Sequence, residues 1–230
     1  MSLSMSAPRI ALIHATSLAM APVADAFNRL WPEVVLMNVL DDRLSADLAL
    51  GGQLDEPLTQ RFIDLASYVK QAGAKAILFT CSAFGPAIEA ARQVVSLPTY
   101  KPNEAMFLEA LEASASSGAL CIGLLSTFAP SVPSMSQELL AVARSRGSTV
   151  ELVTACAAGA MEALATGDAA THDRLVAERA EELAHCDVVM LGQFSMARAQ
   201  GAVAARLGKP VLTSPDSAVR LLQKSLSAAT

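Results

Sequence analysis

Short apolar runs alternate along the chain with longer segments whose apolar residues recur at helical spacing. In the first part of the chain, the apolar runs cover residues 9–15, 33–40 and 74–81, and the amphipathic segments between them cover 22–31 and 55–71. β-Branched runs of this length are typical of buried strands, and the segments between them fit helices. This order predicts a parallel sheet with helices on both faces.

The same pattern restarts after residue 118. Three apolar runs and two amphipathic segments alternate again, and Thr171 is predicted to cap the second of these helices. Strands are predicted over 119–127, 148–156 and 187–193, helices over 132–146 and 171–184, and a last strand with its helix over 209–223. The fold class predicted from this repetition is α/β, with two similar doubly wound halves.

The connection between the halves is predicted from proline content. Residues 93–104 contain two prolines and are interpreted as the crossover. The last strand and helix are interpreted as returning to the first half, so the expected halves are 1–98 plus 209–230 and 99–208. Because open α/β sheets bind ligands outside the carboxyl ends of their strands, a cleft is expected where the halves face each other.

Composition excludes several classes of function. Hydrophobic residues make up 53% of the chain and charged residues 17%, which is typical of a compact globular protein. No apolar run approaches the roughly 18 residues needed to span a bilayer. The net charge is −5 and there is no basic cluster, so nucleic acid is not an expected partner. The opening residues lack the features of a signal peptide, which favours a cytoplasmic location.

The cysteines are expected to be free thiols. Cys81, Cys121, Cys156 and Cys186 are far apart and form no CxxC pair. With three scattered histidines they make a poor zinc set, so no metal site is predicted. Cys121 and Cys186 lie in or beside apolar strands and are interpreted as buried packing residues.

Cys81 is the main candidate for chemistry. It follows a predicted strand in the stretch AILFTCSAFGPAIEAAR, residues 76–92, which then becomes a helix. A thiol beside the first N–H groups of a helix can form a thiolate and act as a base or nucleophile. Ser82 and Ala83 offer N–H groups, and Ser82 a hydroxyl, to a carboxylate. A packed cysteine with an ordinary pKa is the equally weighted alternative.

Polar residues at the other strand ends are further candidates. Ser126 and Thr127 can hold an anion through hydroxyl and backbone groups, although hydroxyls at turns more often satisfy local backbone. Gln193 can bind but cannot carry a proton, and Ser195 requires a base before it can act. His14 is a candidate acid or base, with a satisfied turn histidine as the alternative.

Loop and helix residues give weaker candidates. Asn38 and Asp41 follow the second strand and can hydrogen-bond a substrate, although loop polar residues usually do not. His172 and His185 are interpreted as solvated positions on a helix and at its end. No GxGxxG, GxxxxGK[ST] or GxSxG motif is present, so nucleotide binding and α/β-hydrolase chemistry are not favoured.

Several of these stretches together resemble the aspartate/glutamate/hydantoin racemase superfamily. They occur in order and at compatible spacing over nearly the whole chain: TCSAFGPAIEAAR, GLLST, GAMEALATGD, LGQFSMA and VLTSPDSAVRLL. The resemblance implies two α/β halves related by a pseudo-twofold axis, a cleft between them, and cofactor-independent chemistry on a small carboxylate or amino-acid-like substrate. The resemblance also implies a homodimer or another homo-oligomer.

The resemblance implies two catalytic cysteines, one from each half. Cys81 matches the first, and Ser82 with Ala83 matches the carboxylate cradle beside it. At the second position this sequence has Gln193, with Ser195 as the nearest hydroxyl. Cys156 ends a neighbouring strand and is a further candidate to reach the cleft, but it does not match that position. One-sided proton transfer, maleate-type cis–trans isomerisation, decarboxylation and non-catalytic binding of a small acid therefore remain open.

Overall fold

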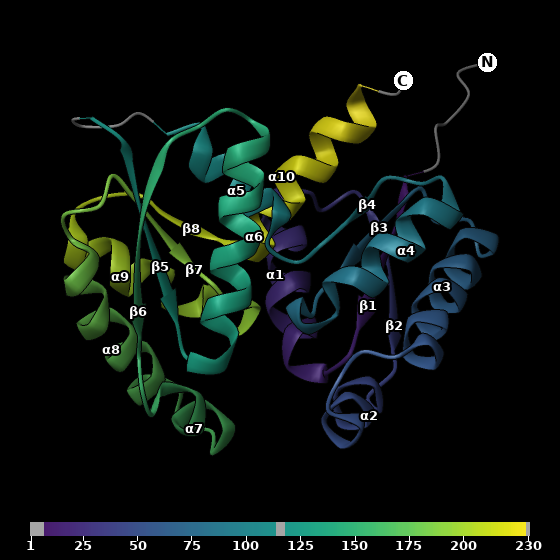
Figure 1. The fold of residues 1–230 in the computed structure, drawn as a ribbon, viewed down its shortest axis with the longest axis horizontal. Helices are drawn as coiled ribbons and strands as arrows, with labels where there is room; N and C mark the ends of the chain where they lie inside the picture. The colour runs from purple at the N-terminus through teal and green to yellow at the C-terminus, as the bar shows by residue number, and fades with distance from the viewer. Residues whose placement is uncertain (1–6, 114–117, 229–230) are drawn as a thin grey trace. The chain divides into compact units, whose positions relative to one another are not determined.

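The protein folds into two compact units. The computed structural model describes residues 7–113 and 118–228 (Figure 1). The first unit is drawn from 1–102 and 218–230, and the second from 103–217. Each unit contains a four-stranded parallel sheet, and the two sheets have equivalent strand orders, β2-β1-β3-β4 and β6-β5-β7-β8. The prediction of two similar α/β halves, each with a parallel sheet, is confirmed.

In the first unit, the two central strands are buried on both faces. β1 buries every residue after its first, and β3 is buried throughout. All pairings in this sheet are parallel, with β2 and β4 at its edges. The strands are β1 (Arg9–His14), β2 (Val35–Leu40), β3 (Ala76–Phe79) and β4 (Thr99–Tyr100).

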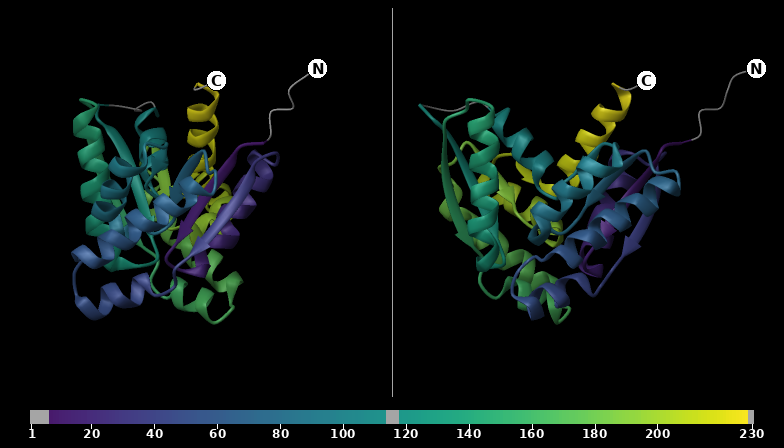
Figure 2. Two further views of the ribbon diagram at one scale, coloured as in Figure 1. Left: turned by 90° about the vertical axis from the view of Figure 1, so that its right-hand side faces the viewer. Right: turned by 45° about the vertical axis from the view of Figure 1, so that its right-hand side comes forward.

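Helices cover both faces of this sheet. On one face α3 and α4 pack against alternate strand residues such as Ala11, Ile13 and Ile77, and α1 and α10 lie on the other (Figures 1 and 2). Gln223 in α10 donates to the Leu30 carbonyl at the end of α1 (2.9 Å). The helices are α1 (Met20–Leu30), α2 (Leu44–Gly51), α3 (Glu56–Gln71), α4 (Gly85–Val95) and α10 (Ser214–Ser227).

The second unit has two apolar layers, one on each face of its sheet. Ile122 and Leu124 of β5 pack with α5 and α6, whereas Cys121 and Leu125 pack with α8 and α9. This alternation follows from the two-residue period of a strand. The strands are β5 (Leu120–Ser126), β6 (Val150–Cys156), β7 (Val188–Leu191) and β8 (Val211–Thr213).

The helices of this unit lie on opposite sides of its sheet, with α5 and α6 on one side and α8 and α9 on the other (Figure 1). They are α5 (Glu104–Leu111), α6 (Val132–Ser145), α7 (Ala160–Ala165), α8 (Ala169–Ala180) and α9 (Gln200–Leu207). Among the described helices of both units, none combines the length and apolar character needed to cross a bilayer.

Three details differ from the sequence-based expectations. The strand expected to return to the first half is β8, which pairs with β7 in the second sheet, and the boundary between the units falls inside α10. The cap of α8 is Asp168, whose carboxylate accepts from the Thr171 N–H, because an ionised carboxylate at this point satisfies a free donor. His172 was expected to be solvated, but it is fully buried in α8, with Nδ1 2.8 Å from Asp173.

Candidate active site

Cys81 lies at the carboxyl end of β3 with its thiol in contact with two donors. The backbone at Cys81 is extended, and the residue caps a short 3₁₀ helix, Ser82–Phe84, that leads into α4. The half-buried sulfur accepts hydrogen bonds from the Ala83 N–H and from the Ser45 hydroxyl. The local arrangement expected from the sequence, a thiol beside the N–H groups of a helical turn, is present.

Burial and hydrogen bonding act on this thiol in opposite directions. Burial raises the pKa of Cys81, because a thiolate is poorly stabilised away from water. The hydrogen bonds from Ala83 and Ser45 lower the pKa, but by less than burial raises it. Near neutral pH the side chain is therefore a protonated thiol with two donors already placed to stabilise the thiolate.

Ser45 was not among the residues selected from the sequence. It lies in α2, and its hydroxyl is also 3.4 Å from the Ala15 carbonyl. Arg61 of α3 holds this part of the chain, because its guanidinium contacts Asp41 (2.5 Å) and Asp47 (2.7 Å). Asp41, a candidate for substrate binding, is thus occupied by an ion pair.

The i,i+4 spacing of Arg43 and Asp47 is a signal from which α2 could have been predicted. This spacing supports a helix over that segment, but nothing in it indicates that Ser45 reaches a thiol from a distant strand.

His14 closes β1 and is fully buried, with both ring nitrogens in hydrogen-bonding contact. Nδ1 is 2.9 Å from the Thr80 hydroxyl and Nε2 is 3.0 Å from Asn38 Oδ1. Burial lowers the pKa of His14, and the Asn38 hydrogen bond only partly opposes this, so the ring is neutral at neutral pH. His14 thus holds Thr80, the residue before Cys81, and Asn38 contacts the histidine with its carbonyl oxygen.

In the second unit, the side-chain amide of Gln193 forms hydrogen bonds with polar residues at and after the end of β5. Its Nε2 donates to the hydroxyls of Ser126 (2.7 Å) and Ser131 (3.1 Å). Its Oε1 accepts from the Thr127 N–H (3.0 Å) and lies 3.4 Å from the Thr127 hydroxyl. A side-chain amide has two N–H donors and two acceptor lone pairs, so this one is fully satisfied. Ser131 was not among the residues selected from the sequence.

A glycine sets the position of this amide. A side chain on Gly192 would place its Cβ 3.1 Å from Met135, 3.2 Å from Leu124 and 3.2 Å from the Leu125 carbonyl. Because one of these neighbours is backbone, it cannot move aside cheaply. The close approach of residue 192 to β5 brings Gln193 within hydrogen-bonding distance of Ser126 and Thr127.

The structure brings the candidates together in two groups, one in each unit. His14, Asn38 and Cys81 lie at the ends of neighbouring strands of the first sheet, and Ser126, Thr127 and Gln193 lie at the ends of the second. Ser195 is half-buried in the 3₁₀ helix Phe194–Ala199.

Cys156 ends β6 and is the register partner of Ser126, a member of the Gln193 group, on the neighbouring strand β5. It lines a cavity of about 360 Å³ with residues of α8 that include Leu175 and Arg179.

The family to which the chain belongs follows from its match to a known family model. A family model described as Asp/Glu/Hydantoin racemase matches residues 15–222. The chain belongs to the Asp/Glu/hydantoin racemase family. The resemblance carried by the TCSA and QFSMA stretches is therefore confirmed, and the family supports a racemase-like or isomerase-like enzyme.

Solved structures of the same build include several enzymes. Glutamate racemase isoform RacE1 from Bacillus anthracis is 16% identical, with a TM-score of 0.69 over 97% of this chain and 83% of that one. Allantoin racemase from Klebsiella pneumoniae is 15% identical, with a TM-score of 0.72 over 97% and 89%. Unliganded arylmalonate decarboxylase is 21% identical, with a TM-score of 0.64 over 94% and 91%. At these identities the likeness concerns the fold, and no curated protein matches the chain in sequence.

Proposed function

We propose that this member of the Asp/Glu/hydantoin racemase family is a cofactor-independent enzyme that uses one thiol, Cys81, to move a proton at a carbon next to a carboxylate or carbonyl. The proposal rests on how Cys81 and Gln193 differ in their surroundings. These residues stand at the two positions where the family resemblance implies catalytic cysteines. Cys81 has a thiol with donors around its sulfur, whereas Gln193 has an amide with all its hydrogen-bonding groups satisfied. An amide cannot relay a proton at neutral pH.

The protonated state of Cys81 favours proton donation to one face of the substrate. In such a reaction, a C–C bond to a carboxylate breaks, CO₂ leaves, and the electron pair forms an enediolate. The Cys81 S–H bond then supplies the proton to carbon, and the resulting thiolate is stabilised by Ala83 and Ser45. A proton from solvent restores the thiol. Delivery from one side makes a single enantiomer.

The second candidate function starts from the thiolate. The hydrogen bonds from Ala83 and Ser45 support a thiolate that removes an α-proton, or that adds to a double bond as in maleate-type isomerisation. Racemisation would then need a second donor such as His14 or Ser195. Carboxylate binding is assigned to Ser82 and Asn38 in the first unit. In the second unit, Ser126 and Thr127 are the residues assigned to binding an anion.

The decisive experiment is NMR in D₂O with aspartate, glutamate, hydantoins, maleate and substituted malonates. We expect conversion of a malonate or a related acid, with one deuterium at the new C–H and one enantiomer. Rapid α-deuteration with appearance of the opposite enantiomer would instead establish a racemase. Ligand-induced stabilisation without turnover of any substrate would favour a binding protein.

The pH dependence separates the two roles of Cys81. If the thiol donates, kcat/KM is expected to stay level through neutral pH and to fall as the pH passes the raised pKa of Cys81, where the proton is lost. If the thiolate acts, kcat/KM rises about tenfold per pH unit over the same range. Ser45→Ala removes an interaction that lowers the pKa of Cys81, so the pH at which kcat/KM changes is expected to move upward. If that pH is the same in the variant as in the wild type, the pH dependence does not come from Cys81.

A homo-oligomer in the cytoplasm is part of the same proposal. Edge strand β2 supports the oligomer, because its Val35 and Leu40 are 46% and 42% exposed. Light scattering of the purified protein, with Leu40→Glu as the disrupting variant, tests the oligomeric state.

A further inference from the structure

Two cysteines and a histidine meet at the start of the second sheet, away from the Gln193 group. Cys121 is the second residue of β5, and His185 and Cys186 lie just before β7. Their ligand atoms, one from each residue, all lie within 4.8 Å of one another. Cys186 Sγ is 3.8 Å from His185 Nε2. These three residues are called the Cys–His–Cys cluster below.

Backbone and charged groups hold the cluster together. The Cys121 N–H donates to the Asp187 carboxylate (2.8 Å), and the Asp187 N–H donates to the Cys121 carbonyl (2.9 Å). These two bonds fix the strand that bears one thiol against the segment that bears the other two ligands.

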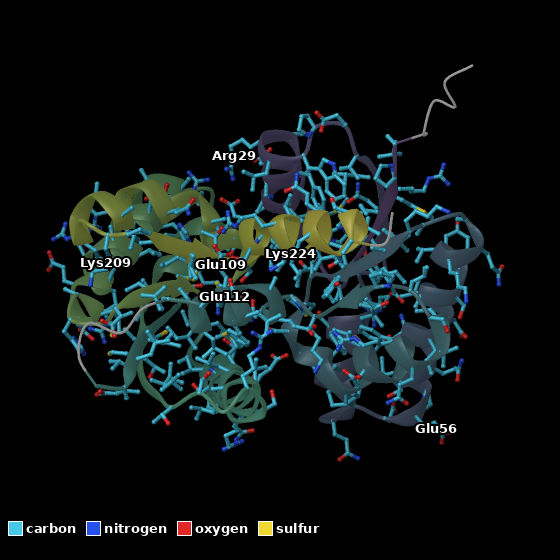
Figure 3. The ribbon with its side chains drawn as sticks, turned by 90° about the horizontal axis from the view of Figure 1, so that it is seen from above. Arg29, Glu56, Glu109, Glu112, Lys209 and Lys224 are labelled. Atoms are coloured by element: carbon cyan, nitrogen blue, oxygen red, sulfur yellow. The ribbon has the colours of Figure 1, made fainter. Side chains whose placement is uncertain are left out.

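Lys209 fixes the turn on either side of His185. Its ammonium donates to the carbonyls of Ala184 (2.7 Å) and Cys186 (2.5 Å). Lys209, labelled in Figure 3, lies between α9 and β8. Three ligand-bearing residues from two segments are therefore preorganised before any ligand arrives.

We propose that the Cys–His–Cys cluster binds one thiophilic divalent metal ion of the Zn²⁺ class. Two sulfurs and one imidazole are ligands that Zn²⁺ prefers. With Zn–S bonds of about 2.3 Å and Zn–N bonds of about 2.0–2.1 Å, tetrahedral geometry sets the S···N distance near 3.6 Å. The observed 3.8 Å is close to that value. His185 is exposed, so a water molecule can supply the fourth ligand.

Coordination has a cost at the buried sulfurs. Cys121 and Cys186 are 9% and 1% exposed. Burial and the neighbouring Cys121 thiol raise the pKa of Cys186 to about 12, so the metal must displace a proton. A bound Zn²⁺ replaces that proton with a stronger positive partner and deprotonates the thiol.

The metal ion is expected to stabilise the second sheet rather than to take part in chemistry at the strand ends. Cys121 and Ser126 are five residues apart on β5, which is about 17 Å along a strand. The cluster is thus remote from the strand ends that carry the polar residues of this unit. Its effect is expected on stability, by linking the starts of β5 and β7.

Cobalt titration of the reduced, metal-free full chain tests the proposal. CoCl₂ should bind one ion per chain and produce thiolate-to-cobalt charge-transfer absorption, and ZnCl₂ should displace it and raise Tm. Cys121→Ser and Cys186→Ser should abolish the absorption. His185→Ala changes an exposed residue, so it keeps the core intact and should raise Kd by at least about tenfold.

Cys156→Ser is the matched control, because it removes one thiol outside the cluster and should leave Kd unchanged. Circular dichroism checks that each variant is folded. Absence of the charge-transfer absorption in the wild type, or an unchanged Kd in folded His185→Ala, overturns the proposal. Formation of a Cys121–Cys186 disulfide, with no cobalt absorption after reduction, also overturns it and assigns the pair to redox chemistry.

Discussion

Cys81→Ala is expected to lower kcat/KM by about 10²–10⁴-fold on any substrate that the protein turns over, because in the proposed function Cys81 is the group that carries the proton. The loss should appear in kcat rather than in KM, since the thiol acts on the reacting carbon and contributes little to holding a carboxylate. The half-buried side chain is small, so the variant should fold. Initial rates of product formation measured with wild type and variant side by side give the ratio.

Two further variants make this result specific to position 81. Cys156→Ala removes a half-buried thiol from the second unit and should retain wild-type kcat/KM. Cys81→Ser keeps a hydroxyl near the Ala83 N–H but holds its proton far more tightly than a thiol, so it should be nearly as impaired as alanine. If Cys81→Ala retained more than a tenth of the wild-type rate, the catalytic group would have to be sought elsewhere.

The main elements of the fold could be predicted from hydrophobic patterning, because buried parallel strands are continuous apolar runs. Residues 120–126 and 188–191 illustrate this, since they are strands and are almost wholly buried. The short elements α2 and α5 were missed, because eight residues carry too little periodicity. The assignment of strand 211–213 was wrong, because its sequence has no feature that distinguishes pairing with β7 from pairing in the other sheet.

The candidate site was predicted in its residue types more than in its contacts. The position of Cys81 at a strand end beside a helical turn follows from local sequence, because the thiol and the Ala83 N–H are two residues apart. The contact between Ser45 and Cys81 joins segments that only tertiary packing brings together. The meeting of Cys121 with His185 and Cys186 is likewise invisible to spacing rules, since those rules look for ligands close in sequence.

Gln193→Cys is expected to give the enzyme a second proton-carrying group and so change the stereochemistry of its reaction. The family resemblance places a cysteine at this position. With thiols at both 81 and 193, α-deuteration or racemisation of product should exceed that of Gln193→Ser by at least about 10²-fold, because serine offers the same size without an acidic S–H. Chiral chromatography and deuterium incorporation measure both quantities.

The same variant should also be less stable than the wild type. Cysteine cannot replace the four contacts of the Gln193 amide, so the Thr127 N–H loses its acceptor and the hydroxyls of Ser126 and Ser131 each lose a donor. Leaving the buried Thr127 N–H without an acceptor costs about 1–3 kcal/mol, which a urea titration can resolve. The double variant Cys81→Ala/Gln193→Cys separates the two roles. If the cysteine at 193 reaches the reacting carbon, this double variant should deliver protons to the opposite face and invert the product. Unchanged enantiomeric purity in active Gln193→Cys would show that position 193 lies outside the reach of the substrate, and the polar cluster around Gln193 would then be purely structural.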